Sequence, residues 1–176
     1  AKWGKIDILF ANAGFSGTSA PITSYPDDIF DKVMAVNVRG SFLACKYALP
    51  EMNDNGSIII TSSIMVVTAR PGSIAYITSK HALIGLMRGV AKESAPRNIR
   101  VNVLAPGPVD NAFQLEIEER ASKASGTNVT EMLNIWISLG RHASPKEIAN
   151  TAYFLASNKS SFSTGSVFMA DGGMHI

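Results

Sequence analysis

Four short, almost continuous apolar runs recur along the chain, flanked by turn-forming residues such as glycine, proline and asparagine. They occupy residues 5–11, 57–61, 99–104 and 166–170. Runs of this length and composition are typical of strands buried on both faces of a parallel sheet. The pattern therefore predicts four strands, with a turn at residues 53–56 before the second of them.

Longer segments with helical apolar periodicity lie between these runs. Residues 27 to about 52 carry broad apolar coverage, and they begin with Asp27 and Asp28, which suit the positive end of a helix. Residues 73–94 predict a second helix, which ends before Pro96 because proline cannot continue a helical hydrogen-bond pattern. Both helices are apolar over more than one face, which indicates burial against several neighbours.

The last third of the chain is more varied. The stretch from residue 110 to residue 143 is more polar and predicts one or two short helices. After it, Ser144, Pro145 and Glu147 provide an N-cap, a first-turn proline and the glutamate of a capping box. This signature predicts a further helix that reaches about residue 157.

Strands and helices that alternate in this order predict an α/β fold, a single domain with a parallel sheet and right-handed crossovers. As the outermost strand, residues 5–11 would leave an apolar edge unpaired. No glycine-rich Gly-x-x-x-Gly-x-Gly turn precedes that strand in this sequence. We therefore expect the chain, residues 1–176, to be the later part of a larger nucleotide-binding domain whose amino-terminal βαβ units are absent.

Composition narrows the class of protein. Apolar residues make up 46% and charged residues 17%, and the net charge is +2 with no basic run. This balance argues against nucleic-acid or membrane-surface binding. Cys45 is the only cysteine, which excludes an intrachain disulfide and suits a reducing compartment. No apolar run is long enough to span a bilayer, so we expect a soluble, cytoplasmic protein.

The stretch from residue 61 to residue 80 carries the most suggestive chemistry. Tyr76 and Lys80 lie four residues apart on a predicted helix, so their side chains project from one face. Ser63 follows the second strand, at the edge where parallel sheets bind ligands. A phenol, an ammonium and a hydroxyl placed together could transfer a proton at a carbonyl or an alcohol. The Tyr-x-x-x-Lys spacing alone is weak evidence, and taken in isolation it favours a half-buried tyrosine beside a solvated lysine.

Further motifs follow the other strand ends and continue to the end of the chain. They are Asn12-Ala13-Gly14, Asn37, Ser63, Tyr76 to Lys80, Pro106-Gly107, Arg141, Pro145, Glu147, Phe154-Leu155, Thr164-Gly165 and Asp171-Gly172-Gly173. Together they cover essentially the whole chain and resemble the short-chain dehydrogenase/reductase family. The resemblance implies a Rossmann-type, doubly wound parallel sheet. It also implies an oxidoreductase that moves a hydride between NAD(H) or NADP(H) and a secondary alcohol or ketone.

The resemblance assigns a role to each candidate catalytic residue. Tyr76 is the general acid/base, and Lys80 would lower a phenol pKa that starts at about 10, as would an oxidised nicotinamide. Lys80 would also hold the nicotinamide ribose, and Ser63 would hydrogen-bond the substrate oxygen. Asn37 would bind a water that links Lys80 to solvent, although a side chain bonded to nearby backbone explains this residue as well. Ser62 has no catalytic role, because the family's spacing to Tyr76 fits Ser63.

The resemblance also implies the contacts of the cofactor, NAD or NADP. Gly14 would let the backbone approach the ligand closely. Family members commonly carry threonine at the position of Asn111, whose side chain could still bond the carboxamide. The pyrophosphate turn and the residue that selects NAD or NADP have no counterpart in this sequence, so both cofactors stay open. The implied contacts are Asn12, Ala13 and Gly14 on the adenosine-ribose side, Tyr76 and Lys80 at the ribose, and Pro106, Gly107, Val109 and Asn111 beside the nicotinamide.

Other candidate residues fit structural roles better. His81, His142 and His175 lack the spacing of a metal site, so we expect no metal. Cys45 fits the core better than a nucleophile's place. The segment 110–143 is the expected substrate-binding segment, and an apolar pocket wall would indicate an apolar substrate. The candidate wall residues, which helix packing alone would also explain, are Met65, Val66, Val67, Phe113, Leu115, Met132 and Trp136.

Two alternatives to the alcohol dehydrogenase or ketoreductase hypothesis stay open. The helices at residues 27–52 and 73–94 resemble those that pair family subunits into homodimers or homotetramers. A non-catalytic chain that serves assembly only is therefore one alternative. Because Tyr-x-x-x-Lys relatives include epimerases and dehydratases, such a reaction is the other. The expected partner is a small-molecule alcohol or carbonyl substrate.

Overall fold

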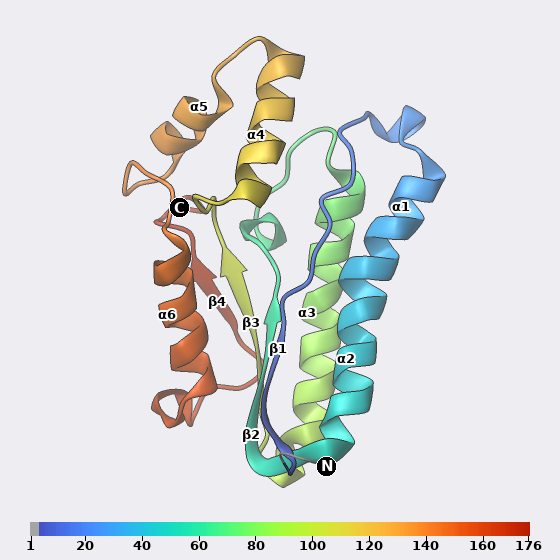
Figure 1. Cartoon of the computed structure of the whole chain (residues 1–176), viewed down its shortest axis with the longest axis vertical. Coiled ribbons are helices and arrows are strands. Elements are labelled where there is room, and N and C mark those ends of the chain that lie inside the picture. The colour runs from blue at the N-terminus through green and yellow to red at the C-terminus, as the bar shows by residue number, and fades with distance from the viewer. Residues whose placement is uncertain (1–3) are drawn as a thin grey trace.

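Four parallel strands form the centre of the computed structural model, which describes residues 4–176. The strands β1 (Ile6–Ala11), β2 (Met52–Thr61), β3 (Arg100–Pro106) and β4 (Val167–Ala170) lie side by side in that order (Figure 1). Every neighbouring pair is parallel. All the carboxyl ends therefore meet at one edge of the sheet, and the predicted α/β fold with a parallel sheet is confirmed.

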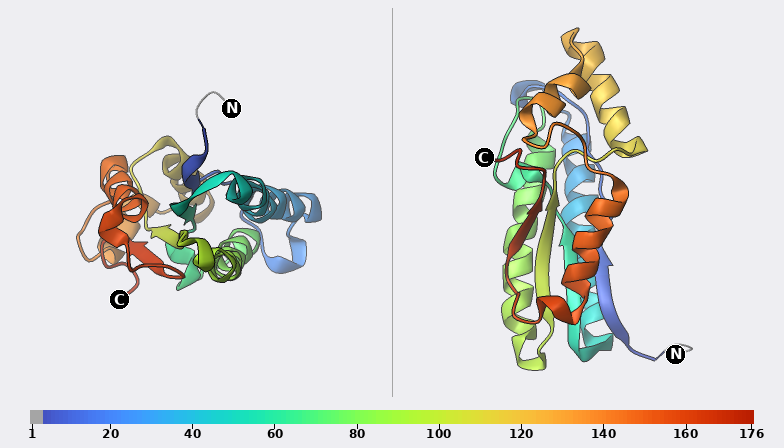
Figure 2. Two further views of the ribbon diagram at one scale, coloured as in Figure 1. Left: turned by 90° about the horizontal axis from the view of Figure 1, so that it is seen from below. Right: turned by 90° about the vertical axis from the view of Figure 1, so that its left-hand side faces the viewer.

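Helices cover both faces of this sheet, as a doubly wound fold requires. On one face α1 (Asp27–Met34) continues through a π-helical turn, η2 (Ala35–Arg39), into α2 (Gly40–Ala48), and α3 (Ile74–Ser94) packs beside them. On the other face lies α6 (Pro145–Ala156) (Figure 2). The long helix predicted from residue 27 is thus nearly continuous, with one π-helical turn between α1 and α2.

Side chains along β2 alternate between the two faces, which divides the core into two layers. Ile58 and Ile60 belong to the cluster that includes Leu83 of α3, whereas Ile59 packs with Leu155 of α6. All five side chains are at most 1% exposed. Burial of each one contributes about 1.5–3 kcal/mol to folding. The carboxyl edge of the sheet is therefore held in place by tightly packed side chains on both faces of the sheet.

The second strand begins earlier than the sequence pattern predicts. Residues 53–56, expected as a turn, belong to β2. Ile6 of β1 pairs with Met52 while Ile8 pairs with Ser57, so the extra residues bulge out of the ladder. Asn55 has a φ of +66°, a left-handed conformation that asparagine tolerates. The turn-forming residues thus create an irregularity within a strand instead of ending one.

The segment between residues 110 and 143 forms two helices, α4 (Ala112–Ser125) and α5 (Val129–Trp136). They stand beyond the carboxyl edge of the sheet (Figure 1). The side chains of Asn111 and Asn128 cap their amino ends. The prediction of one or two short helices in this segment is confirmed.

The start of α6 also follows its sequence signature. Ser144 and Glu147 form the predicted capping box, in which each side chain bonds the other residue's backbone. The remaining short helical turns are η1 (Ile22–Ser24), η3 (Leu49–Glu51), η4 (Ile64–Val66), η5 (Ala95–Arg97) and η6 (Asn158–Ser160).

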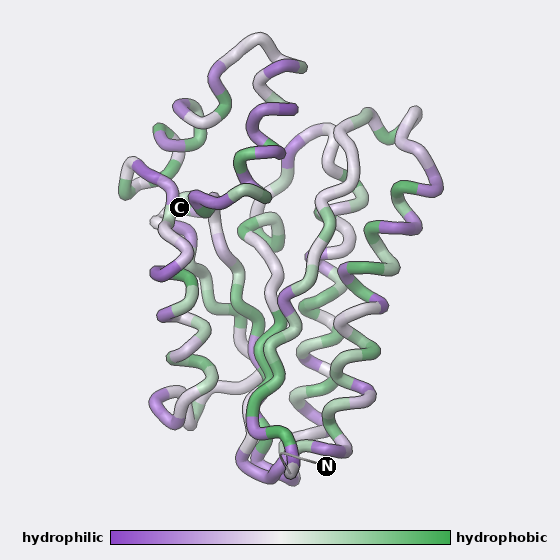
Figure 3. The backbone as a smooth tube through the Cα atoms, in the orientation of Figure 1, coloured by the Kyte–Doolittle hydropathy of each residue, from purple (hydrophilic) through white to green (hydrophobic). Residues whose placement is uncertain are grey.

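Apolar residues concentrate in the strands, whereas α4 carries many polar residues (Figure 3). The outer strand β1 is an exception to complete burial, because Ile6, Ile8 and Phe10 are 37%, 50% and 45% exposed. The apolar edge predicted for this strand is confirmed. Among residues 4–176, no helix combines the length and the apolar character needed to cross a membrane.

Candidate active site

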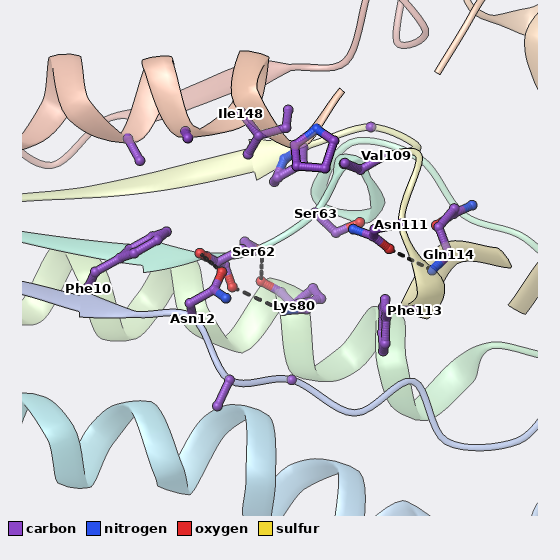
Figure 4. Close-up of a pocket in the computed structure, with 18 of the residues that line it drawn as sticks. Phe10, Asn12, Ser62, Ser63, Lys80, Val109, Asn111, Phe113, Gln114 and Ile148 are labelled. Atoms are coloured by element: carbon purple, nitrogen blue, oxygen red, sulfur yellow. Dashed lines mark hydrogen bonds between the residues drawn. The ribbon is translucent and has the colours of Figure 1, made fainter. Parts of the chain in front are cut away.

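A cavity of about 510 Å³ lies at the carboxyl edge of the sheet. Its walls come from the ends of β1, β2 and β3, from α3 and from α6, and Figure 4 shows side chains of these elements around it. All the predicted catalytic and cofactor-binding residues except Asn37 line this cavity. The predicted residues that line the cavity are Asn12, Ala13, Gly14, Ser63, Tyr76, Lys80, Pro106, Gly107, Val109 and Asn111.

Lys80 brings a buried ammonium to this cavity. The side chain is 3% exposed, and its Nζ donates a hydrogen bond to the Thr61 carbonyl oxygen at 3.0 Å. Ser62 Oγ donates to the Lys80 carbonyl oxygen at 2.9 Å, a structural role that agrees with the choice of Ser63 over Ser62. Burial lowers the pKa of the Lys80 ammonium to about 8.

The ammonium of Lys80 has three N–H donors, and in the described part of the chain one donor is engaged, by Thr61. The other two are available to ligand oxygens in the cavity that Lys80 lines. The hydroxyls of a ribose match this requirement, because they offer adjacent acceptors to one cation. The residues present therefore fit the nicotinamide-ribose half of NAD or NADP.

Tyr76 lies one helical turn before Lys80, and Lys80 Nζ is 5.4 Å from the centroid of the Tyr76 ring. Burial raises the pKa of the Tyr76 phenol, and a hydrogen bond with the Ser63 side chain and the charge of Arg70 oppose this without reversing it. The lowering expected from Lys80 is therefore wrong for this arrangement. Burial dominates, and Lys80 directs its ammonium at the Thr61 carbonyl oxygen.

Asn37 is fully buried in the π-helical turn and holds the loop that follows β1. Its Oδ1 accepts from the Phe15 backbone N–H at 2.8 Å, and its Nδ2 donates to the Phe15 carbonyl oxygen at 3.0 Å and to Ser79 Oγ at 2.9 Å. A β-carbon at Gly14 would lie 3.8 Å from Asn37 Oδ1 and 3.7 Å from Lys80 Nζ. Asn37 thus positions the loop beside Lys80, while its role toward a water stays a prediction.

The loops after the strands are also held by specific contacts. Thr61 Oγ1 donates to Asn12 Oδ1 at 2.8 Å, which joins the ends of β1 and β2. A β-carbon at Gly107 would lie 2.8 Å from the Asp171 α-carbon, so only glycine fits there. Asn111 Oδ1 accepts from the Gln114 backbone N–H at 2.9 Å, which engages this oxygen in capping α4.

A second cavity of about 450 Å³ shares Ser63 and Tyr76 with the first and extends beneath α4 and α5. Met65, Phe113 and Met132 line it as predicted. The other predicted wall residues, Val66, Val67, Leu115 and Trp136, do not belong to its lining. Two lining residues that the sequence analysis missed are Arg70 and Arg120. Fifty positions separate them, and no motif connects them.

Cys45, His142 and His175, which the sequence analysis assigned to structural roles, lie among core residues or next to carboxylates. Cys45 is buried, and burial raises the pKa of its thiol to about 11, which suits a core residue. His142 Nε2 lies 2.7 Å from Glu118 Oε1, and His175 Nδ1 lies 2.6 Å from Asp171 Oδ2. Among residues 4–176, no group of three or more histidine, cysteine or acidic side chains could hold a metal ion.

Comparisons with known proteins agree with this architecture. A family described as enoyl-(acyl carrier protein) reductase matches residues 1–175. A 3-oxoacyl-[acyl-carrier-protein] reductase, FabG, of Thermotoga maritima is 37% identical over 177 residues, covering 99% of this chain and 68% of FabG. The chain belongs to the short-chain dehydrogenase/reductase family. Its predicted resemblance to this family and its Rossmann-type fold are therefore confirmed.

A further relative and a solved structure match nearly the whole of this chain. An uncharacterised oxidoreductase, YxbG, of Bacillus subtilis (strain 168) is 40% identical over 179 residues, covering 97% of this chain and 63% of YxbG. The crystal structure of landomycin C-6 ketoreductase LanV with bound NADP and rabelomycin matches with a TM-score of 0.83 and 31% identity. The match covers 97% of this chain and 62% of LanV. The chain spans about two thirds of the length of the curated relatives it matches.

Proposed function

We propose that this protein is an NAD(P)-dependent oxidoreductase that interconverts a secondary alcohol and a ketone, with Tyr76 as the general acid/base. The observation that carries the proposal is the meeting of Ser63, Tyr76 and Lys80 in one cavity at the carboxyl edge of the sheet. The relatives support it, since LanV is a ketoreductase with bound NADP and FabG is a 3-oxoacyl-[acyl-carrier-protein] reductase.

In the direction of reduction, the nicotinamide of NAD(P)H supplies the hydride. Tyr76 donates its phenolic proton to the carbonyl oxygen as negative charge develops there. Ser63 donates a hydrogen bond to the same oxygen and stabilises that charge. The raised pKa of Tyr76 keeps the phenol protonated at neutral pH, which suits an acid in this direction. Oxidation of an alcohol reverses these proton transfers and requires the phenolate.

Lys80 and Asn37 would support this proton transfer, Lys80 by holding the cofactor and Asn37 by binding a water. The two N–H donors of Lys80 that face the cavity would hold the ribose hydroxyls. Asn37 would bind a water that connects Lys80 with solvent, so that the phenolate can regain its proton. The pKa of about 8 lets Lys80 give up a proton at little energetic cost.

The remaining cavity residues would hold the cofactor. Asn12, Ala13 and Gly14 would border the adenosine ribose. Pro106, Gly107, Val109 and Asn111 would border the nicotinamide. Asn111 Nδ2 would donate a hydrogen bond to the carboxamide oxygen of the nicotinamide, because Asn111 Oδ1 is engaged in capping α4.

The segment 110–143 would bind the substrate, since α4 and α5 supply walls of the second cavity next to Tyr76. The exposed helix faces of α2 and α3 would join subunits into a homodimer or a homotetramer. Phe42 and Tyr47 of α2 are 45% and 67% exposed, which leaves apolar surface for such contacts. Sedimentation velocity tests the assembly, and a purely monomeric protein contradicts it.

The test of the function is a panel of ketones and secondary alcohols incubated with the purified protein and NADH or NADPH. We expect oxidation or reduction of the nicotinamide, followed by its absorbance, with at least one class of carbonyl compound. Saturable binding of NADH or NADPH, with conversion of a substrate but no net redox change, would favour an epimerase or dehydratase. A protein that binds neither cofactor would favour the assembly-only alternative.

A further inference from the structure

Two arginines face the second cavity, the one that opens from Tyr76 and Ser63 toward α4 and α5. Arg70 comes from the loop between η4 and α3, and Arg120 comes from α4. Both side chains are half-buried. The two guanidinium groups are close enough to influence one another electrostatically, and the charge of Arg70 also reaches Tyr76. The cavity therefore carries two positive charges beside the candidate catalytic tyrosine.

These arginines have neutral partners. Arg70 Nε donates to Ser73 Oγ at 3.0 Å, and within residues 4–176 its two Nη atoms make no hydrogen bond. Arg120 Nη1 donates to the Gly17 carbonyl oxygen at 3.2 Å, and its Nη2 donates to Ser16 Oγ at 3.3 Å. In the described part of the chain, neither arginine forms a salt bridge. Each keeps N–H donors that an oxyanion can use, because a guanidinium has five.

Glu118 is the acidic residue whose charge reaches Arg70. It is 3% exposed, and its carboxylate is engaged elsewhere. Oε1 accepts from Gln114 Nε2 at 2.7 Å and lies 2.7 Å from His142 Nε2, while Oε2 accepts from Thr130 Oγ1. Its carboxylate oxygens are therefore occupied by Gln114, Thr130 and His142, and among residues 4–176 neither arginine has a directly bonded counter-ion.

Two cations of like charge, held near each other in a partly desolvated cavity, are unfavourable unless an anion joins them. A carboxylate matches the planar fork of a guanidinium in a two-bond geometry. The same cavity is also lined by apolar side chains, among them Met65, Phe113 and Ile117.

We propose that the substrate is an oxo acid, or the corresponding hydroxy acid, whose carboxylate binds Arg70 and Arg120. Its carbonyl or hydroxyl carbon then lies at Ser63 and Tyr76, and an apolar chain joins the two groups. This substrate class rests on the proposed function, because it places the reacting carbon at Tyr76. It extends that function by assigning a specificity role to two residues outside the family motifs.

The experiment compares oxo acids of increasing length between the carboxylate and the ketone with their methyl esters, using the complete protein and NADPH or NADH. We expect kcat/KM for at least one acid to exceed that of its ester by about tenfold or more, as a charge-assisted pair contributes. Arg120→Gln should lower kcat/KM for that acid by about tenfold and change the ester less than about twofold. Arg70→Gln should lower kcat/KM for the acid by about tenfold more than for the ester, because the charge of Arg70 also reaches Tyr76, on which both substrates depend. Lys159→Gln, which removes an exposed positive charge on η6, is the control and should change neither substrate.

Arg120→Glu sharpens the test. It should exclude the acid while the ester still reacts, which separates loss of charge recognition from loss of folding. Equal activity on acids and esters in the natural protein, or equal losses on both in the glutamine variants, would overturn the substrate class and leave the oxidoreductase function standing. If no ketone reacts, the proposed function fails. The anion site is then tested by calorimetric titration of the same acids and esters with NADP⁺ present, where ester binding as tight as acid binding overturns it.

Discussion

Ser63 lies just after β2, and Tyr76 and Lys80 lie on α3, whereas the cover formed by α4 and α5 lies beyond the sheet. Around Lys80 the polar groups are buried and bonded to backbone atoms of neighbouring elements. On the cover, Ile135 and Trp136 are 81% and 56% exposed, and few side chains are fully buried. The three proposed catalytic residues are thus held by the packed sheet and its covering helices (the frame), whereas the cover is held mainly by hydrogen bonds between side chains.

Glu118 is the centre of the contacts that hold the cover. Its carboxylate joins α4 to Thr130 of α5 and to His142 in the loop before α6. Burial on its own raises the pKa of Glu118, but hydrogen bonds from Thr130, Gln114 and His142 outweigh burial and leave the pKa below its ordinary value. One ionised side chain therefore connects three elements of the cover.

This contrast agrees with the proposed function, in which the frame carries the proton transfer and the cover binds the substrate. Groups that transfer a proton need fixed positions, which packed strands and helices provide. Residues that select a substrate can change without loss of the fold when they lie on a lightly packed segment. Four substitutions test this division, from the largest expected effect to the smallest.

Tyr76→Phe should abolish most of the turnover without changing the stability of the frame. We expect turnover to fall by about 10³-fold or more, because the general acid/base is lost, with NADPH binding retained. The measurements are ketone-dependent oxidation of NADPH and titration of NADPH fluorescence. Tyr153→Phe, at an exposed position of α6, is the control and should behave as the natural protein. Retained turnover in Tyr76→Phe would refute the assigned role.

Asn37→Ala should affect the frame itself. The substitution leaves the Phe15 backbone N–H and carbonyl without their partner, which costs about 3 kcal/mol of unfolding free energy. Urea denaturation measures the loss, and Asn150→Ala on the exposed face of α6 is the control. A loss as small as that of Asn150→Ala would show that Asn37 does not hold the loop after β1.

Lys80→Met should separate stability from activity. The lowered pKa means that the folded protein binds fewer protons at Lys80 than the unfolded chain between about pH 8 and its ordinary value of 10.5, so natural stability rises with pH over that window. At pH 7 the charged lysine is disfavoured by burial, and methionine should raise unfolding free energy by about 2 kcal/mol after the loss of the bond to Thr61.

Turnover of Lys80→Met should be strongly reduced at the same time. Its advantage in stability should shrink as pH rises from 7 to 10, when measured by denaturation at each pH. Lys92→Met, at an exposed position of the same helix, is the control and should show neither change. A Lys80→Met variant that is less stable than the natural protein at pH 7 would contradict the cost of burial.

Glu118→Gln should loosen the cover and leave the frame intact. We expect a loss of about 1–2 kcal/mol and faster amide hydrogen exchange that is confined to residues 110–143. Because the pKa of Glu118 is lowered, its contribution is present above the ordinary value of 4.5 and is lost as pH falls through the lowered value. Glu119→Gln, an exposed neighbour, is the control. Faster exchange throughout the sheet would show that the cover and the frame are not separate.

Local residue pattern was enough to predict the strands, the start of α6 and the candidate residues at the strand ends. Strands with continuous apolar runs, and a capping box such as that of Ser144 and Glu147, depend on neighbours within a few positions. The order of motifs from Asn12 to Gly107 placed them at one edge, because parallel strands align their carboxyl ends. The turn expected at residues 53–56 was wrong, since the same residues serve a bulge once β1 lies beside them.

Only the tertiary structure decided which side chains far apart in the sequence come into contact, and how deeply each of them is buried. Arg70 and Arg120 line the same cavity. Asn37 binds the Phe15 backbone, and Glu118 contacts His142. The spacing of these residues in the sequence does not predict any of the three pairs. The pKa of Tyr76 is raised, against expectation, because burial outweighs the charges around it. Burial and long-range electrostatics depend on the packed three-dimensional arrangement, whereas strand and helix formation depends largely on local sequence.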